Sequence, residues 1–215
     1  MAEHIDLKAI EKNVLKTAHQ HGLFEMIIGF VISGMSFGPF FRDGLPSPYN
    51  YFLWPLILIV IAVVLLFIIV KYVILPRTGI AKPGPSLKSM RKKLFIAIFI
   101  QLAIHIVLIF LLVIGSGSGI HVEGITFILI VGLFIMPIFG IIAYLMKYSR
   151  LYLIGMLIWL GIFINELLHD FLDYKIRYLL SYGITGTIIF FIGLIIFIRF
   201  LKKYPLQKGD SMKNV

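Results

Sequence analysis

The stretch LILIVIAVVLLFIIV, from Leu56 to Val70, decides the fold of this 215-residue chain. It holds no charged side chain and does not alternate apolar with polar residues, which excludes a strand of a membrane barrel. A helix needs about 20 mostly apolar residues to cross roughly 30 Å of hydrocarbon. Because backbone polar groups in lipid must bond within the protein, we expect an all-α, polytopic transmembrane helical bundle.

Composition supports a membrane protein along the whole chain. Hydrophobic residues make up 60% of it and charged residues only 14%, roughly half the share of a soluble domain. The mean hydropathy is +1.01. Cysteine is absent, which excludes disulfides, thiolate metal sites and a cysteine nucleophile. The formal net charge of +10 would suggest nucleic-acid binding in a soluble protein, so the positions of the basic residues matter.

Six segments are long and apolar enough to be predicted as spans. They are residues 24–41, 52–75, 94–114, 125–146, 151–168 and 179–200. The first and fifth are the shortest and each carries a carboxylate, so a four-span alternative stays open. Residues 1–23 have the apolar spacing of an amphipathic interfacial helix and not of a cleaved signal peptide, and residues 201–215 form a basic tail. No part outside the predicted spans is long enough to bury a core of its own, which excludes a soluble catalytic domain.

The basic residues predict the orientation of the bundle. With the N-terminus inside, seventeen of the twenty lie on the cytoplasmic side, and only Arg42, Lys175 and Arg177 lie outside. The inner side then has a net charge of +12 and the outer side −2. The positive-inside rule therefore places both termini in the cytoplasm, in a cell (plasma or inner) membrane. The excess charge is explained by topology, so we expect anionic lipid headgroups and no nucleic acid as partners.

Three short stretches carry a resemblance. The first span begins with GLFE (Gly22–Glu25), the first cytoplasmic loop opens with PRTG (Pro76–Gly79), and the last span ends with RFLKKYP (Arg199–Pro205). The chain thus resembles a group of small uncharacterised prokaryotic multi-pass membrane proteins with G-x-x-E, P-R-x-G and R-F-L-x-x-Y-P at these places. The resemblance implies a prokaryotic protein with several spans, and it implies no catalytic residue.

Polar residues inside the predicted spans are candidates for function, because they are costly in lipid. Glu25 and Lys71 lie at similar depths in two antiparallel neighbours, and we expect them to form an ion pair. Gln101 and His105 are the deepest polar groups and share one helix face. They are either a proton or ligand contact at the midplane or an interhelical hydrogen bond.

The outer end of the fifth span predicts a candidate cation site. Its members would be Glu166, His169, Asp170 and Asp173, with His121 and Glu123 from a loop on the same side. Glu-x-x-His spacing occurs in helix-bundle metal sites. The alternative is a helix end that extends its charges into water, and no metal or cofactor is firmly predicted.

Small residues and one proline predict the packing of the helices. The first span contains Gly29, Gly34 and Gly38, and the sixth contains Gly183 and Gly186. Such residues let helix backbones approach closely, within the chain or against a second subunit. Pro137 in the fourth span predicts a kink, which is either a hinge or a packing irregularity.

These features leave three classes of function. A structural, regulatory or accessory membrane subunit, working in an oligomer or with another membrane subunit, is the first choice. The alternatives are a small-solute or ion transporter or channel that uses Gln101 and His105, and an intramembrane metal-binding enzyme that uses Glu166, His169 and Asp170. H-E-x-x-H, G-x-S-x-G and phosphate-loop patterns are absent from the sequence, so we do not expect an enzyme or a cofactor.

Overall fold

A computed structural model describes residues 21–42, 49–78, 89, 92–97, 99–104, 106–107 and 125–205. Within these ranges the regular secondary structure is helical and contains no strand, which confirms the predicted all-α class there. Three of the described helices are long and apolar enough to cross a membrane: Leu53–Thr78, Arg150–Leu167 and Tyr174–Lys203. Length and composition are therefore those of a membrane protein.

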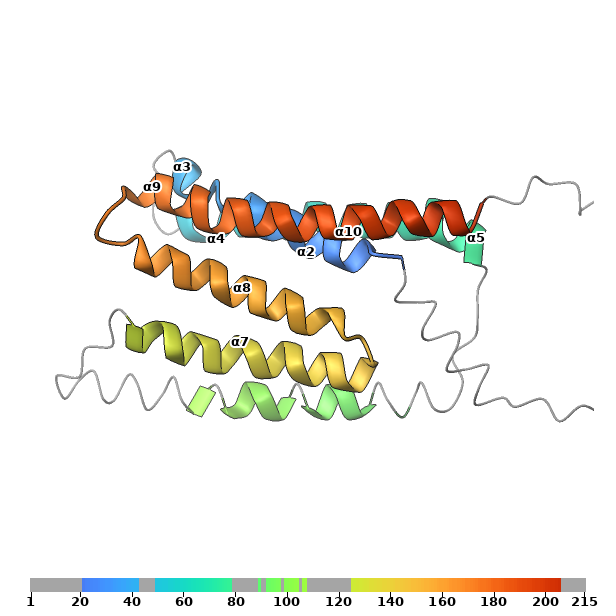
Figure 1. The fold of residues 1–215 in the computed structure, drawn as a ribbon, viewed down its shortest axis with the longest axis horizontal. Coiled ribbons are helices and arrows are strands. Elements are labelled where there is room, and N and C mark those ends of the chain that lie inside the picture. Colours follow the sequence, from blue (N-terminus) through green and yellow to red (C-terminus); the bar gives the residue numbers. More distant parts are fainter. Residues whose placement is uncertain are drawn as a thin grey trace, which may run out of the picture.

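The described helices pack side by side as a bundle of roughly aligned helices (Figure 1). The order is set by the contacts between neighbours: α4 (Tyr49–Ile69) packs on α2 (Leu23–Met35), and α2 on α10 (Ile184–Lys203). α8 (Arg150–Leu167) contacts α10 and reaches the start of α2 through Arg150, and it in turn contacts α7 (Ile125–Met146). The helix pairs are therefore formed by segments far apart in the chain as well as by sequence neighbours.

α4 packs mainly on α2 and exposes most of its apolar side chains. Val63 is 59% exposed and Phe67 61%, whereas Leu58 and Ala62 are buried on the side that faces α2. A helix that is apolar on all sides is typical of a membrane span. The exposed surface of α4 is therefore suited to lipid or to another membrane helix.

The segment predicted as the first span, residues 24–41, is divided into two helices. α2 has 13 residues and rises about 20 Å, less than the hydrocarbon thickness. After Met35 the chain turns and continues as α3 (Gly38–Arg42). Pro39 explains the break, since its ring would clash with the Met35 carbonyl in a continuous helix. The indole nitrogen of Trp54 donates a 2.9 Å hydrogen bond to the Gly34 carbonyl at the end of α2, which also accepts from the Phe37 nitrogen at 3.1 Å.

The two longest helices each include a π-helical turn. η1 (Val70–Ile74) follows α4 and is followed by α5 (Leu75–Thr78), and η2 (Leu179–Gly183) joins α9 (Tyr174–Tyr178) to α10. A π turn bonds each residue to the fifth one along and so contains an additional residue. The last helix begins five residues before the predicted boundary, because Asp173 caps it by accepting a backbone N–H at 3.1 Å.

The helices of the structure agree in part with the remaining predicted spans. α7 has the predicted bounds 125–146 and continues through Pro137 without loss of helical structure, and α8 is displaced by one residue from 151–168. In the predicted third span, residues 94–97, 99–104 and 106–107 are helical. The predicted interfacial helix, apart from residues 21–23, and residues 206–215 of the tail lie outside the described residues.

Candidate functional site

The contact between α2 and α10 is made by backbone against backbone. A Cβ atom on Gly29 would lie 2.3 Å from the Phe190 nitrogen and 2.7 Å from the Gly186 oxygen. A Cβ on Gly186 would lie 2.2 Å from the Ser33 nitrogen, and one on Gly193 would lie 2.5 Å from a backbone nitrogen of α2. Only glycine fits at these three positions, so the two helices approach more closely than side chains allow.

The other glycines predicted to pack lie against side chains. A Cβ on Gly34 would lie 2.6 Å from Leu58 of α4, one on Gly38 would lie 3.4 Å from Trp54, and one on Gly183 would lie 3.3 Å from Ser36. The neighbour is a side chain in each case, and a side chain moves more easily than a backbone. These three positions are therefore more tolerant than the contact of α2 with α10.

Glu25 lies in the first turn of α2 and is completely buried. Its Oε1 accepts hydrogen bonds from the Tyr148 hydroxyl and from Nη1 of Arg150, at 3.1 Å from the latter. The N-terminal end of a helix favours a negative charge at this position. Oε2 is also buried and has no hydrogen-bond partner in the structure. The Glu25 cluster, which we define as Glu25, Tyr148 and Arg150, thus ties the start of α2 to the start of α8.

The turn between α7 and α8 positions the partners of Glu25. Lys147 has a left-handed backbone with φ of 51°, while the Tyr148 nitrogen donates to the Ala143 oxygen at 2.9 Å and the Lys147 nitrogen donates to Tyr144 at 3.3 Å. This is the Schellman pattern of a helix C-terminus, in which glycine usually occupies the left-handed position. The reversal brings Tyr148 back over the end of α7 and directs it toward α2.

The predicted ion pair of Glu25 with Lys71 is wrong. Lys71 is exposed, and its ammonium group lies 5.7 Å from the ring centre of Phe67 and 5.4 Å from that of Tyr72, both near it in the chain. The prediction assumed that helices adjacent in sequence would supply the partner. Instead, the turn at the start of α8 brings Arg150 and Tyr148 to the carboxylate, which was not evident from spacing.

The Tyr148 hydroxyl is held in its neutral form. Burial of the side chain and, secondarily, its hydrogen bond to Glu25 raise the pKa of the Tyr148 phenol above its ordinary value. A neutral phenol donates its proton to the carboxylate, which matches the hydrogen bond in the structure. Tyr148 therefore acts as a fixed donor over the usual pH range.

A small buried cluster lies at this same end of the bundle. Leu23, Ile74 and Phe200 form one buried cluster, with Tyr204 packed against it. Their side chains come from the first turn of α2, the end of η1 and the end of α10. Segments separated by more than 100 residues along the chain thus share one small core at the end that carries the Glu25 cluster.

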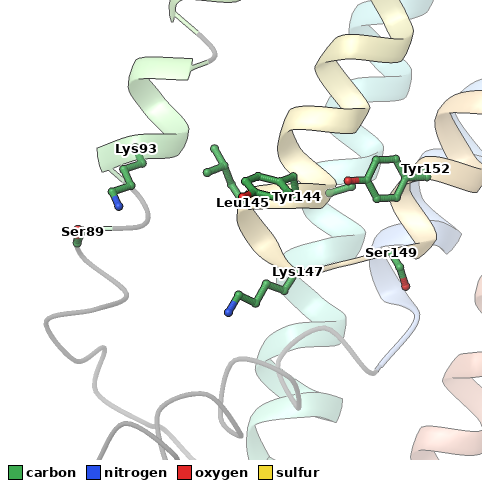
Figure 2. A pocket seen from close by; sticks show the side chains of 8 residues that line it. Ser89, Lys93, Tyr144, Leu145, Lys147, Ser149 and Tyr152 are labelled. Carbon is green, nitrogen blue, oxygen red and sulfur yellow. The ribbon is translucent and has the colours of Figure 1, made fainter.

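A cavity of about 660 Å³ lies beside the turn between α7 and α8 (Figure 2). Ser89 and Lys93 line it from one side, and the rest of the lining comes from the end of α7, the turn and the start of α8: Ala143, Tyr144, Leu145, Lys147, Ser149 and Tyr152. Among the described residues, the lining contains two lysines and no carboxylate. Sequence reasoning missed this cavity, because the charges of Lys93 and Lys147 were interpreted only as signals of topology.

The predicted pair at the midplane is described only in part. Gln101 lies in a helical segment and is half-buried, while His105 lies outside the described residues. Elsewhere in the described bundle, the buried hydroxyl of Ser181 donates to the side chain of Asn165 at 3.3 Å, and Ser33 shares a hydrogen bond of 3.4 Å with the exposed Thr187. These polar groups bond to each other.

The described members of the candidate cation site, at the opposite end of the bundle, do not come together as a metal site. In the described part of the chain, no three His, Asp or Glu residues lie close enough to hold a metal ion. His169 and Asp170 form an exposed pair at 3.1 Å, and Asp173 caps α9. Glu166 is half-buried near the end of α8. The two loop members, His121 and Glu123, lie outside the described residues.

Comparison of the chain with protein-family models, with curated proteins and with solved structures finds no match.

Proposed function

We propose that this chain is a multi-pass protein of a prokaryotic cell membrane that acts as a structural or regulatory subunit, in an oligomer or with another membrane protein. The proposal includes six spans with both termini in the cytoplasm, from the apolar segments and the distribution of basic residues. Anionic headgroups would then face the end of the bundle that holds the Glu25 cluster.

The observation that carries this proposal is the rigid contact of α2 with α10. Gly29, Gly186 and Gly193 place the two backbones in direct contact, and the Glu25 cluster fixes the end of α2 to α8. A carrier needs helices that rock or slide against each other around a polar site. Backbone contact at three glycines and the ion pair of buried Glu25 with Arg150 oppose such movement, which favours a scaffold over a carrier.

The surface of the described bundle supports the same proposal. α4 contacts the rest of the described chain along one side and exposes apolar side chains over the remainder. Within the helical segment Leu53–Thr78, only 11% of the most apolar 18-residue stretch is buried. A subunit that works with a partner needs such a surface inside the membrane.

Mass measurement and reconstitution together test the proposal. Gentle extraction into nanodiscs followed by native mass spectrometry should give a multiple of 24.5 kDa, or this chain with a second membrane protein in fixed stoichiometry. Because the chain has no cysteine, single cysteines can be introduced on the two sides of α4. A cysteine at exposed Val63 should cross-link to a partner chain, and a cysteine at buried Leu58 is the matched control that should not.

A monomer of 24.5 kDa that carries solute into liposomes would contradict the proposal. Loss of that flux in His105→Ala, with no loss in the control His169→Ala at an exposed position, would establish transport instead. Bound metal that is lost in Glu166→Gln and His169→Ala would favour the enzyme alternative.

A further inference from the structure

Lys147 occupies a backbone position that usually belongs to glycine. Its φ of 51° is left-handed, and the Schellman hydrogen bonds around it hold that conformation in place. L-residues with side chains such as lysine rarely adopt this conformation. A residue held in a disfavoured conformation, where glycine would fit without strain, points to a use for its side chain.

The side chain of Lys147 reaches a cavity that holds a second lysine. Lys93 lies on the opposite wall, and the side chain of Lys147 extends from the turn toward that wall (Figure 2). Neither lysine forms an ion pair with a carboxylate among the described residues. Two ammonium groups on facing walls are suited to a phosphate group.

Hydroxyl donors add to the polar part of the cavity. Ser89 and Ser149 both line it, and the side chain of Ser149 makes no capping hydrogen bond although the residue precedes α8. Hydroxyl groups and lysines donate hydrogen bonds to phosphate oxygens without requiring a particular ester.

The other lining residues are apolar or aromatic. Ala143, Leu145 and the rings of Tyr144 and Tyr152 form the part of the cavity next to α7 and α8, at the point where these apolar helices end. A free anion has no need of such walls, whereas the glycerol and first acyl carbons of a lipid would be covered by them. Tyrosine is also enriched at the headgroup level of membranes.

We propose that this cavity binds the phosphate headgroup of an anionic membrane lipid, held by Lys93 and Lys147. The inference rests on the membrane location in the proposed function, but not on the oligomeric state or on a partner. It differs from general attraction of a basic surface to anionic lipid, because it assigns two lysines among many to one site.

Native mass spectrometry of the full chain tests the site, with added phosphatidylglycerol and phosphatidylcholine as the two lipid probes. Wild-type protein should retain phosphatidylglycerol in preference to phosphatidylcholine. Lys93→Gln with Lys147→Gln should weaken retention of phosphatidylglycerol about tenfold or more, since each lysine near an anionic headgroup is worth roughly a factor of five. The matched control is Lys202→Gln with Lys203→Gln, two exposed lysines at the same end but outside the cavity, and it should bind like the wild type.

Two further variants separate binding from folding. Lys147→Gly relieves the left-handed backbone, so it should melt at the same temperature as the wild type or higher and yet bind phosphatidylglycerol less tightly. Lys147→Arg keeps the charge and should keep the binding. Loss of binding together with loss of stability in Lys147→Gly would overturn the inference, because the lysine would then serve the fold.

Three other results would also overturn it. The first is equal loss of phosphatidylglycerol in the control pair at Lys202 and Lys203, which would show a general basic surface. The second is equal retention of phosphatidylcholine by the wild type. The third is displacement of phosphatidylglycerol by millimolar inorganic phosphate, which would show a site for free phosphate in place of a lipid. An absence of oligomers or partners would contradict the proposed function and leave this inference intact.

Discussion

Replacement of Gly186 by alanine tests the contact that holds the bundle together. The added Cβ would lie 2.2 Å from the Ser33 nitrogen and 2.7 Å from its Cα, and both atoms belong to backbone that cannot rotate away. Ordinary contact distances are about 3.5–4.0 Å, so α2 and α10 would have to separate by roughly 1.5 Å. Overpacking of this kind costs about 1–3 kcal/mol, because neighbouring contacts along the same interface are weakened as well.

Gly140→Ala is the matched control for this substitution. Gly140 also lies inside an apolar helix, α7, but a Cβ there would meet only the ring of Tyr152, at 3.8 Å. Alanine should therefore leave stability unchanged or raise it by up to about 1 kcal/mol through its higher helix propensity.

Thermal unfolding in detergent, followed by the fluorescence of Trp54 and Trp159, provides the measurement. Gly186→Ala should unfold at a lower temperature than the wild type, and Gly140→Ala should not. The double variant Gly29→Ala with Gly186→Ala should lose less than the sum of the two single losses, since one separation of the helices relieves both clashes. Equal stability of Gly186→Ala and Gly140→Ala would refute the close approach of the two backbones.

Two predictions concern the Glu25 cluster. Arg150→Ala should lower the free energy of unfolding by about 1.5–3 kcal/mol, toward the lower end because the guanidinium is 38% exposed, and Lys202→Ala should have no effect in the same denaturation assay. Because the pKa of the Tyr148 phenol is raised, its contribution to stability is present below the unfolded pKa near 10 and is lost as the pH rises through the folded value. The phenolate absorbance at 295 nm should accordingly be the same in wild type and Tyr148→Phe at pH 10–10.5, and an additional titrating tyrosine in the wild type at that pH would show that Tyr148 is not shielded.

A third prediction concerns the bond inside the bundle between α8 and η2. Asn165→Ala should lower stability by about 0.6–1.7 kcal/mol, as is typical of hydrogen bonds between membrane helices, and toward the lower end because Ser181 keeps its 2.8 Å hydrogen bond to the Arg177 carbonyl. The control Thr187→Ala removes a bond at an exposed position and should cost less, so a larger loss there would contradict the ranking.

The apolar segments predicted the positions of the described helices well, because burial in lipid acts on composition over 20 residues. α7 begins and ends at the predicted residues, and α8 differs by one. The same reasoning did not find the break after Met35, although Pro39 in the sequence was a sufficient signal. The error arose because apolar character was counted across the proline and local backbone geometry was not considered.

The site was harder to predict than the spans. Glu25 was correctly singled out as a polar residue with a partner, yet the partner was sought on the adjacent helix in sequence. The partner depends on which helix lies next to α2, and that order depends on glycine contacts between α2 and α10. The left-handed Lys147 could not be found from sequence either, because the hydrogen bonds of the turn impose that conformation on a residue that does not favour it.

The π-helical turn η2 has a consequence for comparing this chain with related sequences. Because the turn holds one residue more than an α-helical turn, removal of a single residue within Leu179–Gly183 would restore a regular helix. Because the turn itself is kept and only its additional residue is lost, the residues before and after the deletion would keep nearly the same orientation relative to each other. Gly186 would therefore still face α2. A relative that lacks one residue here would keep the same interface with its preceding residues shifted by one position in sequence, so an alignment without a gap in this turn would misplace the interface.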